Sequence, residues 1–290
     1  MGFSLDFIAA DADLTPWALG VSILRADGIN PAGISIPAHS LAISTVVLRG
    51  ELWQMDRQGR RSLMPLVYTT GSATQAQGFE GSKDVVCASL MCVASVLPLL
   101  TGASAHGFVN TFAPPDVLGA LTPAELDPTQ SNQALGHCLM AMLRSRLATV
   151  APGEPFLAFL ATLQRWDGRC TVPSGWHTRR WQRACHFQLG VTPKLLQRLV
   201  RLHQSARVAL VNPVSQASVP TKAWVEHALD AGYSDQSHML RDYRALAGLS
   251  PARASAVGDG ENLQALAIGA NSLAPRLLPG LVAVSDFSNT

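Results

Sequence analysis

The stretch that decides the fold is Gly232-Tyr-Ser-Asp-Gln-Ser-His-Met-Leu-Arg-Asp-Tyr-Arg-Ala-Leu-Ala-Gly-Leu-Ser-Pro251. It predicts a turn at Gly232, a helix capped by Ser234 or Asp235, and a stop at Gly248, because glycine accepts the left-handed conformation that ends helices. Ser250-Pro251 then has the cap and first-turn residues of another helix. This succession predicts a helix-turn-helix arrangement.

The helix that follows Gly232 has two chemically different faces. Its apolar residues recur at helical spacing and are predicted to be buried: Met239, Leu240, Tyr243 and Leu246. Ser237, Arg241 and Arg244 fall at i, i+4 and i+7 on the other face, with His238 beside them. Arginines and small polar groups on an exposed face suit phosphate oxygens and base edges, although a plain solvated face is the alternative.

A shorter helix is expected just before this stretch. Residues 222–230 carry an apolar stripe formed by Trp224, Val225, Ala228 and Leu229, and Thr221 is placed to cap the helix. The two helices on either side of Gly232 would then form one helix-turn-helix unit.

An internal repeat strengthens this interpretation. Gly190-Val-Thr-Pro193 matches Gly248-Leu-Ser-Pro251 at an offset of 58, since 248 − 190 = 58. Arg183 matches Arg241 at the same offset, and Trp181 matches Met239. Residues 177–189 therefore predict an earlier recognition helix, with Arg179, Gln182 and Arg183 on its outer face.

Between the repeats, residues 193–210 predict one long helix. Its inward residues are Leu195, Leu196, Leu199, Leu202, Ala206 and Leu210. At about 1.5 Å per residue this helix spans roughly 27 Å. A rigid spacer of that length can hold two recognition helices about one DNA turn, roughly 34 Å, apart.

Together these residues resemble the DNA-binding domain of the AraC/XylS transcriptional regulators, over residues 166–257. The resemblance implies two helix-turn-helix units joined by a linker helix. It places the base-reading positions of the first unit on Arg179, Gln182 and Arg183, and those of the second on Ser237, His238 and Arg241. Gly232, Tyr233 and residues 248–251 match the structural part of the family signature.

The first unit departs from this pattern. By the same offset its first helix should occupy about residues 164–172, but Gly168, Thr171, Val172 and Pro173 are poor helix formers. We expect this unit to be loosened, or rebuilt with residues 154–166 as the packing helix.

Charge is distributed unevenly along the chain. Residues 177–257 hold 11 Lys and Arg against 4 Asp and Glu, a net of +7; the rest holds 22 − 11 = 11 basic and 20 − 4 = 16 acidic residues, a net of −5. A basic segment beside an acidic one favours phosphate binding by that segment.

Composition narrows the class of protein. The 290 residues are 48% hydrophobic and 14% charged, which indicates well-buried globular domains. The N-terminus lacks a signal peptide, and the uncharged run 85–103 contains Pro98 and Gly102, so we expect no membrane span and a cytoplasmic protein. Buried, reduced thiols are expected for the cysteines, which lack metal spacing: Cys87, Cys92, Cys138, Cys170 and Cys185.

The first part of the chain has β signals. Strands are expected at 18–24, 41–48, 51–55, 64–70 and 85–92, a short helix at 94–100, and an amphipathic helix at 130–149. The prediction is an α+β multidomain protein, with a β-rich barrel or sandwich-like domain followed by an all-α double helix-turn-helix domain. Its expected parts are a sensory or dimerisation domain (1–125), a helical connector (126–165), the DNA-binding domain (166–257) and a C-terminal extension (258–290).

The functional hypothesis is a transcription regulator, activator or repressor, that binds double-stranded DNA. A small-molecule effector or a second copy of the chain would act through the first domain, and RNA polymerase would be a partner of an activator. His39, His106 and His137 show no ligand spacing, so neither a metal nor a cofactor is expected. The alternatives are a cysteine-dependent enzyme and a protein-interaction module with a degenerate helix-turn-helix tail; the absence of hydrolase and phosphate-loop motifs favours a non-enzyme.

Overall fold

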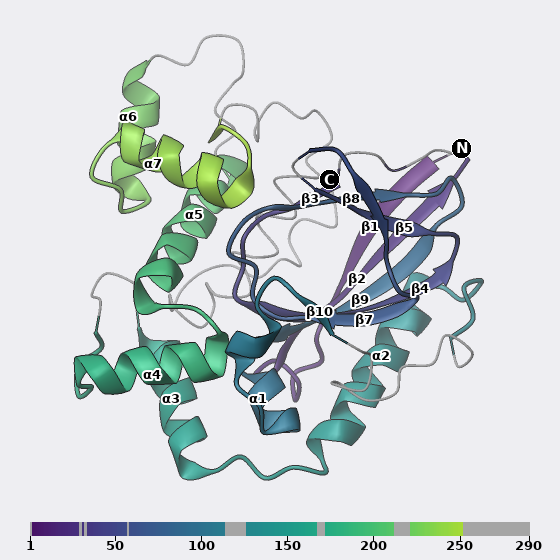
Figure 1. The fold of residues 1–290 in the computed structure, drawn as a ribbon, viewed down its shortest axis with the longest axis horizontal. Coiled ribbons are helices and arrows are strands. Elements are labelled where there is room, and N and C mark those ends of the chain that lie inside the picture. Colours follow the sequence, from purple (N-terminus) through teal and green to yellow (C-terminus); the bar gives the residue numbers. More distant parts are fainter. Residues whose placement is uncertain are drawn as a thin grey trace.

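A β-rich part followed by a helical part makes up the chain (Figure 1). The structure is a computed structural model that describes residues 2–28, 31, 34–56, 58–113, 126–166, 172–211 and 221–251. The predicted α+β class, with a β-rich domain before an all-α region, is confirmed.

Two antiparallel sheets form the β domain within the described residues. The larger has the order β1 (Gly2–Ala9), β2 (Ala18–Asp27), β9 (Val86–Val93), β4 (Leu41–Arg49), β7 (Val67–Thr70) and β10 (Phe112–Ala113). The smaller has the order β3 (Ile34–Ile36), β8 (Gln77–Gly81), β5 (Leu52–Met55) and β6 (Arg61–Leu63). The domain is therefore a sandwich-like pair of sheets, as its short strands predict.

The central strand β4 shows why the sheets stack. Seven consecutive residues, Leu41–Val47, are buried, so both faces of this strand are covered. On one face Val47 packs with Leu52 and Phe79 of the smaller sheet. On the other, Val46 belongs to the core beneath α2 (Asn132–Leu147).

Helix α2 closes that second core with a stripe at i, i+4 and i+8. Leu135, Leu139 and Leu143 are buried there, as the periodicity predicts. Gly136 allows the close approach to β1, because a Cβ at this position would lie 2.7 Å from the Ile8 side chain. Arg144 fastens the helix to the loop after β1 through Asp11 and Asp13.

The expected strands are found with shifted ends, and some strands were not expected. Within 64–70 only Val67–Thr70 is a strand, and the expected short helix is α1 (Val96–Thr101), followed by the 3₁₀ turn η1 (Ala105–Phe108). Strands β1, β3, β6, β8 and β10 have no counterpart among the predictions. No helix in the described residues is long and apolar enough to cross a membrane.

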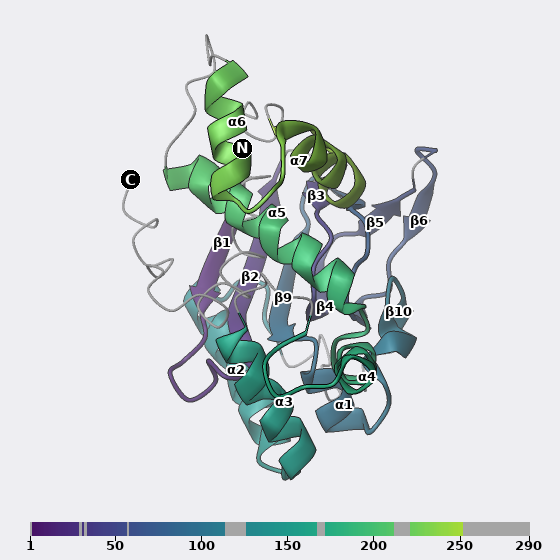
Figure 2. The same cartoon turned by 90° about the vertical axis from the view of Figure 1, so that its left-hand side faces the viewer.

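The helical part consists of α3 (Glu154–Arg165), α4 (Thr178–Leu189), α5 (Pro193–Val211), α6 (Thr221–Asp230) and α7 (Gln236–Asp242), with the π-helical turn η4 (Tyr243–Ala247). α4 lies at one end of α5, while α6 and α7 lie at the other (Figures 1 and 2). Pro251, the last described residue, is helical, while the rest of the helix expected after Ser250 and the extension 258–290 lie outside the described residues.

One expectation about the helical part needs correction. The apolar stripe assigned to α6 is only partly buried: Ala228 is buried, but Val225 and Leu229 are 39% and 54% exposed. The helix instead turns His227 and Ala231 toward α5 and α7. In the first unit, α3 (Glu154–Arg165) supplies a helix at the alternative expected over residues 154–166, and the backbone is extended at Trp166, while residues 167–171 lie outside the described residues.

Candidate nucleic-acid interface

Helix α4 presents the residues predicted for the first unit on one exposed face. Trp181, Cys185 and Leu189 form its buried stripe. The opposite face carries Arg179, Gln182 and Arg183, all exposed. The helix ends where Gly190 adopts a φ of 74°, as the left-handed stop predicts.

An aromatic cluster supports α4 in place of a regular first helix. The Trp181 ring lies 5.5 Å from Phe159 of α3, 5.7 Å from Trp166 and 5.3 Å from Trp176. Trp176 donates its indole N–H to Thr162 Oγ1 at 2.9 Å, which ties the segment before α4 to α3. Stacked and edge-to-face rings contribute beyond their buried area, so this cluster fixes α4 without the helix that the repeat would require.

Helix α7 is set up by a side-chain cap and a buried residue. Asp235 accepts a hydrogen bond from the His238 N–H at 2.7 Å, and this bond is the main reason that the pKa of Asp235 lies below its usual value. Met239 is fully buried at the position that matches Trp181. Ser237 and Arg241 are exposed on the opposite face, so the two predicted recognition helices share one pattern of core and outer residues.

The other two predicted residues of this unit lie in less regular surroundings. His238 is half-buried, with its ring 5.3 Å from Tyr233 and its Nδ1 3.2 Å from Ser234 Oγ. Arg244 is exposed but lies in η4, a π-helical turn that the sequence pattern did not predict. A π turn holds an extra residue, so Arg244 does not follow Arg241 at the spacing of a regular α-helix.

Buried polar contacts fix α6 and α7 on α5. Arg198 Nε of α5 lies 2.8 Å from Asp242 Oδ1, and the Asp242 side chain is 4% exposed. Ser205 Oγ lies 2.7 Å from His227 Nε2 and 3.0 Å from the Tyr243 hydroxyl. Burial lowers the pKa of His227, which keeps its ring neutral in this network.

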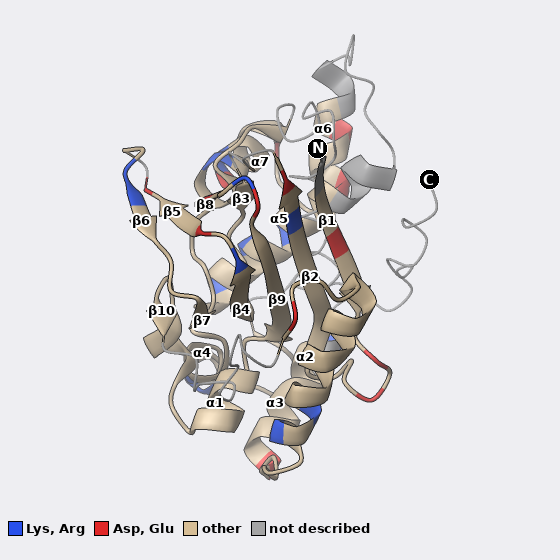
Figure 3. Ribbon diagram, turned by 90° about the vertical axis from the view of Figure 1, so that its right-hand side faces the viewer, with Lys and Arg blue, Asp and Glu red and all other residues tan. Residues whose placement is uncertain are grey.

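The outer face of both helices is basic. The ion pairs found among the described residues do not involve Arg179, Arg183, Arg241 or Arg244, although the charge of Arg241 helps to lower the pKa of Asp235. The side of the β domain shown in Figure 3 has only scattered charges. The arrangement suits an extended anionic partner along α4 and α7.

The β domain contacts the C-terminal ends of both helices. Ser72 Oγ donates to the Leu189 carbonyl at the end of α4, at 2.5 Å. The Ala38 N–H donates to the Leu246 carbonyl in η4, at 2.7 Å. The ring of His106 lies 3.9 Å from that of His186, which adds a contact between η1 and α4. The β domain and the helical part therefore meet at the elements predicted to read DNA.

The three histidines considered for ligand binding do not come together. His39 is buried beside His203 of α5, and burial, then the charge of His203, lowers the pKa of His39 to about 3. His106 lies against α4, while His137 is exposed on α2. Among the described residues there is no group of three metal-ligating side chains.

The cysteines of the described residues are not joined in disulfides, and three of them are buried: Cys87, Cys92 and Cys185. Burial raises the pKa of Cys87 to about 12 and also raises that of Cys185. Because the thiolate is the nucleophile, these surroundings oppose the cysteine-dependent alternative at both positions. Cys170 lies outside the described residues.

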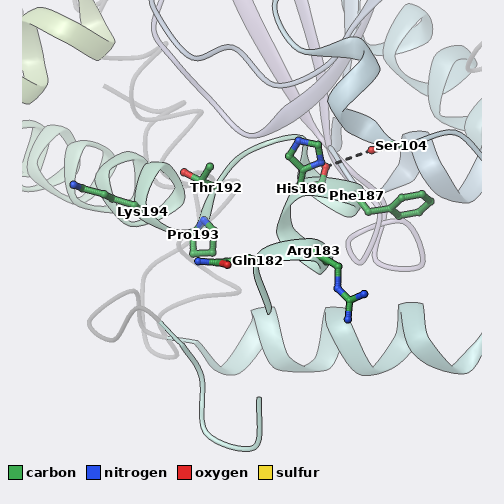
Figure 4. A pocket seen from close by; sticks show the side chains of 8 residues that line it. All are labelled: Ser104, Gln182, Arg183, His186, Phe187, Thr192, Pro193 and Lys194. Atoms are coloured by element: carbon green, nitrogen blue, oxygen red, sulfur yellow. Dashed lines mark hydrogen bonds between the residues drawn. The ribbon is translucent and has the colours of Figure 1, made fainter. Parts of the chain in front are cut away.

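A pocket of about 620 Å³ lies beside α4 (Figure 4). Its lining comes from α4, from the start of α5 and from Ser104 of the β domain: Ser104, Gln182, Arg183, His186, Phe187, Thr192, Pro193 and Lys194. Two of these, Gln182 and Arg183, are predicted base readers. The sequence pattern did not single out Phe187 or Lys194. The exposure of Phe187, 42%, is unusual for a large apolar side chain.

No protein-family model matches the chain, and no curated protein sequence matches it. Among solved structures, ToxT from Vibrio cholerae is 8% identical, with a TM-score of 0.42, over 88% of this chain and 98% of that one. Fatty-acid-bound ToxT of strain SCE256 is 12% identical, with a TM-score of 0.37, over 81% and 93%. An RmlC-like cupin protein from Desulfovibrio desulfuricans is 16% identical, with a TM-score of 0.23, over 31% and 81%. Similarity at this level carries no conclusion about function.

Proposed function

We propose that the chain is a sequence-specific DNA-binding transcription regulator that reads two major-groove segments with α4 and α7. The observation that carries the proposal is the repeat at an offset of 58. Trp181 and Met239 are both fully buried, Arg183 and Arg241 are both exposed, and Gly190 and Gly248 both have a positive φ, 74° and 71°. Two helices with buried residues at matching positions and exposed residues at matching positions suit a partner that is itself periodic, as duplex DNA is.

The chemistry of the exposed side chains supports this assignment. Arg183 and Arg241 can each form two hydrogen bonds to a guanine edge, and Gln182 can do the same with adenine. Arg179, Arg244 and Ser237 can hold phosphates or neighbouring bases. His238 has less freedom than these, because its ring packs against Tyr233.

In this proposal the β domain is the regulatory part. A small molecule or a second copy of the chain bound there would change how α4 and α7 are presented, since the β domain contacts the ends of both helices. RNA polymerase is the further partner if the protein activates transcription, and the cytoplasm is its proposed location.

The test is a selection for bound sequences from random duplex DNA with the full chain. Two intact readers should enrich two sub-sites about one turn, roughly 10 base pairs, apart. Enrichment of no motif would overturn the proposal.

On the selected DNA, Arg241→Ala should weaken specific binding by about 1–3 kcal/mol, roughly 5- to 150-fold, and relax the preference at one base pair. Arg60→Ala is the matched control, because Arg60 is an exposed arginine of the β domain that pairs with Asp56. Wild-type affinity in the Arg241 variant would remove this residue from the interface.

A further inference from the structure

The pocket beside α4 combines cationic groups with no carboxylate in its lining. Arg183 and Lys194 are exposed, and the ion pairs and hydrogen bonds of the described residues involve neither side chain. The start of α5 adds positive potential: Thr192 caps the helix by accepting the Leu195 N–H at 3.2 Å, and helix N-termini favour anions. The pocket therefore has an electrostatic preference for negative charge.

Apolar surface forms much of the remaining wall. Phe187 is 42% exposed, although it is a large apolar residue on the outer face of α4, and Pro193, the first residue of α5, also lines the pocket. Figure 4 shows Lys194 on one side of the pocket and Arg183 with Phe187 on the other, with Gln182 and Pro193 between them. An inorganic anion would leave this apolar wall in contact with water.

The β domain contributes the last wall and fixes its position. Ser104 caps η1 by accepting the His106 N–H, and its hydroxyl lies 3.5 Å from the His186 carbonyl of α4. His186 is in turn held against His106. The pocket is thus built from both parts of the chain, so a molecule bound there contacts the β domain and α4 together.

We propose that this pocket binds a small organic anion with an apolar body, and that this ligand and DNA exclude one another at the first unit. The volume of about 620 Å³ is that of a small-molecule site. The exclusion rests on the proposed function. Gln182 and Arg183 line the pocket and are also the proposed base-reading residues, so they cannot contact the ligand and the base edges at the same time. Bound ligand then lowers the affinity for DNA by the same factor by which bound DNA lowers the affinity for the ligand.

Binding is tested by calorimetric titration of the full chain with three probes. 4-Phenylbutanoate has both the charge and the apolar body, 4-phenyl-1-butanol lacks the charge, and acetate lacks the body. Saturable binding of 4-phenylbutanoate is expected, with the other two weaker by about tenfold or more, since loss of one good contact costs about 1.4 kcal/mol. No saturable binding of 4-phenylbutanoate, or equal binding of all three probes, overturns the proposal.

Variants locate the bound probe. The double variant Arg183→Gln/Lys194→Gln should weaken 4-phenylbutanoate binding by about tenfold or more. The matched control is Arg179→Gln/Arg244→Gln, which removes two exposed arginines that do not line the pocket. Equal weakening in both double variants indicates attraction by net charge alone and overturns the assignment.

Competition is measured with the duplex obtained by selection. Saturating 4-phenylbutanoate should raise the apparent Kd of the wild-type chain for this DNA, and DNA should weaken 4-phenylbutanoate binding by the same factor. Unchanged DNA affinity at saturation overturns the exclusion. A chain that enriches no DNA motif yet binds the probe through Arg183 and Lys194 contradicts the proposed function and leaves the ligand site standing.

Discussion

The backbone N–H of Ala38, in the β domain, donates to the carbonyl of Leu246 in η4, the turn that follows α7, at 2.7 Å. Ser72 Oγ, also in the β domain, donates to the Leu189 carbonyl at the end of α4, at 2.5 Å. The last carbonyls of a helix have no partner within that helix, so outside donors stabilise both ends. The β domain therefore contacts α4 and η4 near their C-terminal ends, so a change in the β domain can reach both elements.

The close packing of Gly190 against the β domain predicts that alanine is more destabilising at Gly190 than at Gly232. Gly190 and Gly232 both have a positive φ, 74° and 81°, so alanine at either should cost about 1–2 kcal/mol through the left-handed conformation. At Gly190 a Cβ would also lie 2.6 Å from Val109 and 2.9 Å from the Ala105 carbonyl, whereas at Gly232 it meets only the Arg201 side chain at 3.7 Å. Gly190→Ala should therefore lower the free energy of unfolding by about 1–3 kcal/mol more than Gly232→Ala, measured by urea titration. Equal losses would mean that the domains do not pack closely at Gly190.

The ion pair between α5 and α7 predicts an asymmetry between its two partners. Arg198 has a side chain that is 31% exposed, but the Asp242 side chain is 4% exposed. Arg198→Met leaves the buried Asp242 carboxylate without its cation and should destabilise the fold by about 3 kcal/mol or more. Asp242→Asn should cost less, because the Arg198 guanidinium stays near water and the amide keeps a hydrogen-bond acceptor. Thermal unfolding of both variants measures the difference. A larger loss for Asp242→Asn would contradict this account.

Local periodicity explains most of what the sequence predicts correctly. The stripe of Trp181, Cys185 and Leu189 and the exposed face of Arg179, Gln182 and Arg183 follow from a spacing of 3.6 residues, and the structure has both. The stop at Gly190 follows from glycine chemistry in the same way. These features depend only on neighbours along the helix.

The failures all depend on distant partners. The stripe on α6 includes Val225 and Leu229 on its far side, and the Ser205–His227 hydrogen bond determines which edge of the helix is buried. Similarly, the π turn at Tyr243–Ala247 lies where Ala38 contacts the helix, and Ser104 enters the pocket from another domain. Because a single sequence does not show which distant residues meet, it could not predict the pocket.

The cap of α7 gives a local prediction. Asp235 accepts the His238 N–H at 2.7 Å, which orders the turn that carries Ser237 and His238. Asp235→Ala should lower the thermal midpoint and weaken binding to selected DNA, because the first turn of α7 loses its cap. Asp235→Ser keeps an oxygen acceptor and should recover most of both losses. Equal behaviour of the two variants would show that the cap does not matter for α7.

The buried histidine between the two domains predicts a loss of stability in mild acid. His39 is 3% exposed, its Nδ1 accepts the Leu41 N–H at 3.2 Å, and burial, then the charge of His203, lowers its pKa from 6.5 to about 3. Since the folded pKa is below the unfolded pKa, the unfolded chain binds the extra proton, and stability present above pH 6.5 is lost as the pH falls toward 3. Between pH 6.5 and pH 5, His39 alone should remove about 1.5 kcal/mol, and His227, whose pKa is also lowered, acts in the same direction.

The measurement is the free energy of unfolding of the full chain by urea titration across this pH range. His39→Asn keeps an acceptor near Nδ1 and removes the titrating group, so its stability should fall less steeply with acid than that of the wild type. His137→Asn, at an exposed position of α2, should keep the wild-type slope. A wild-type slope in the His39 variant would show that this histidine does not link the contact between β domain and α5 to pH.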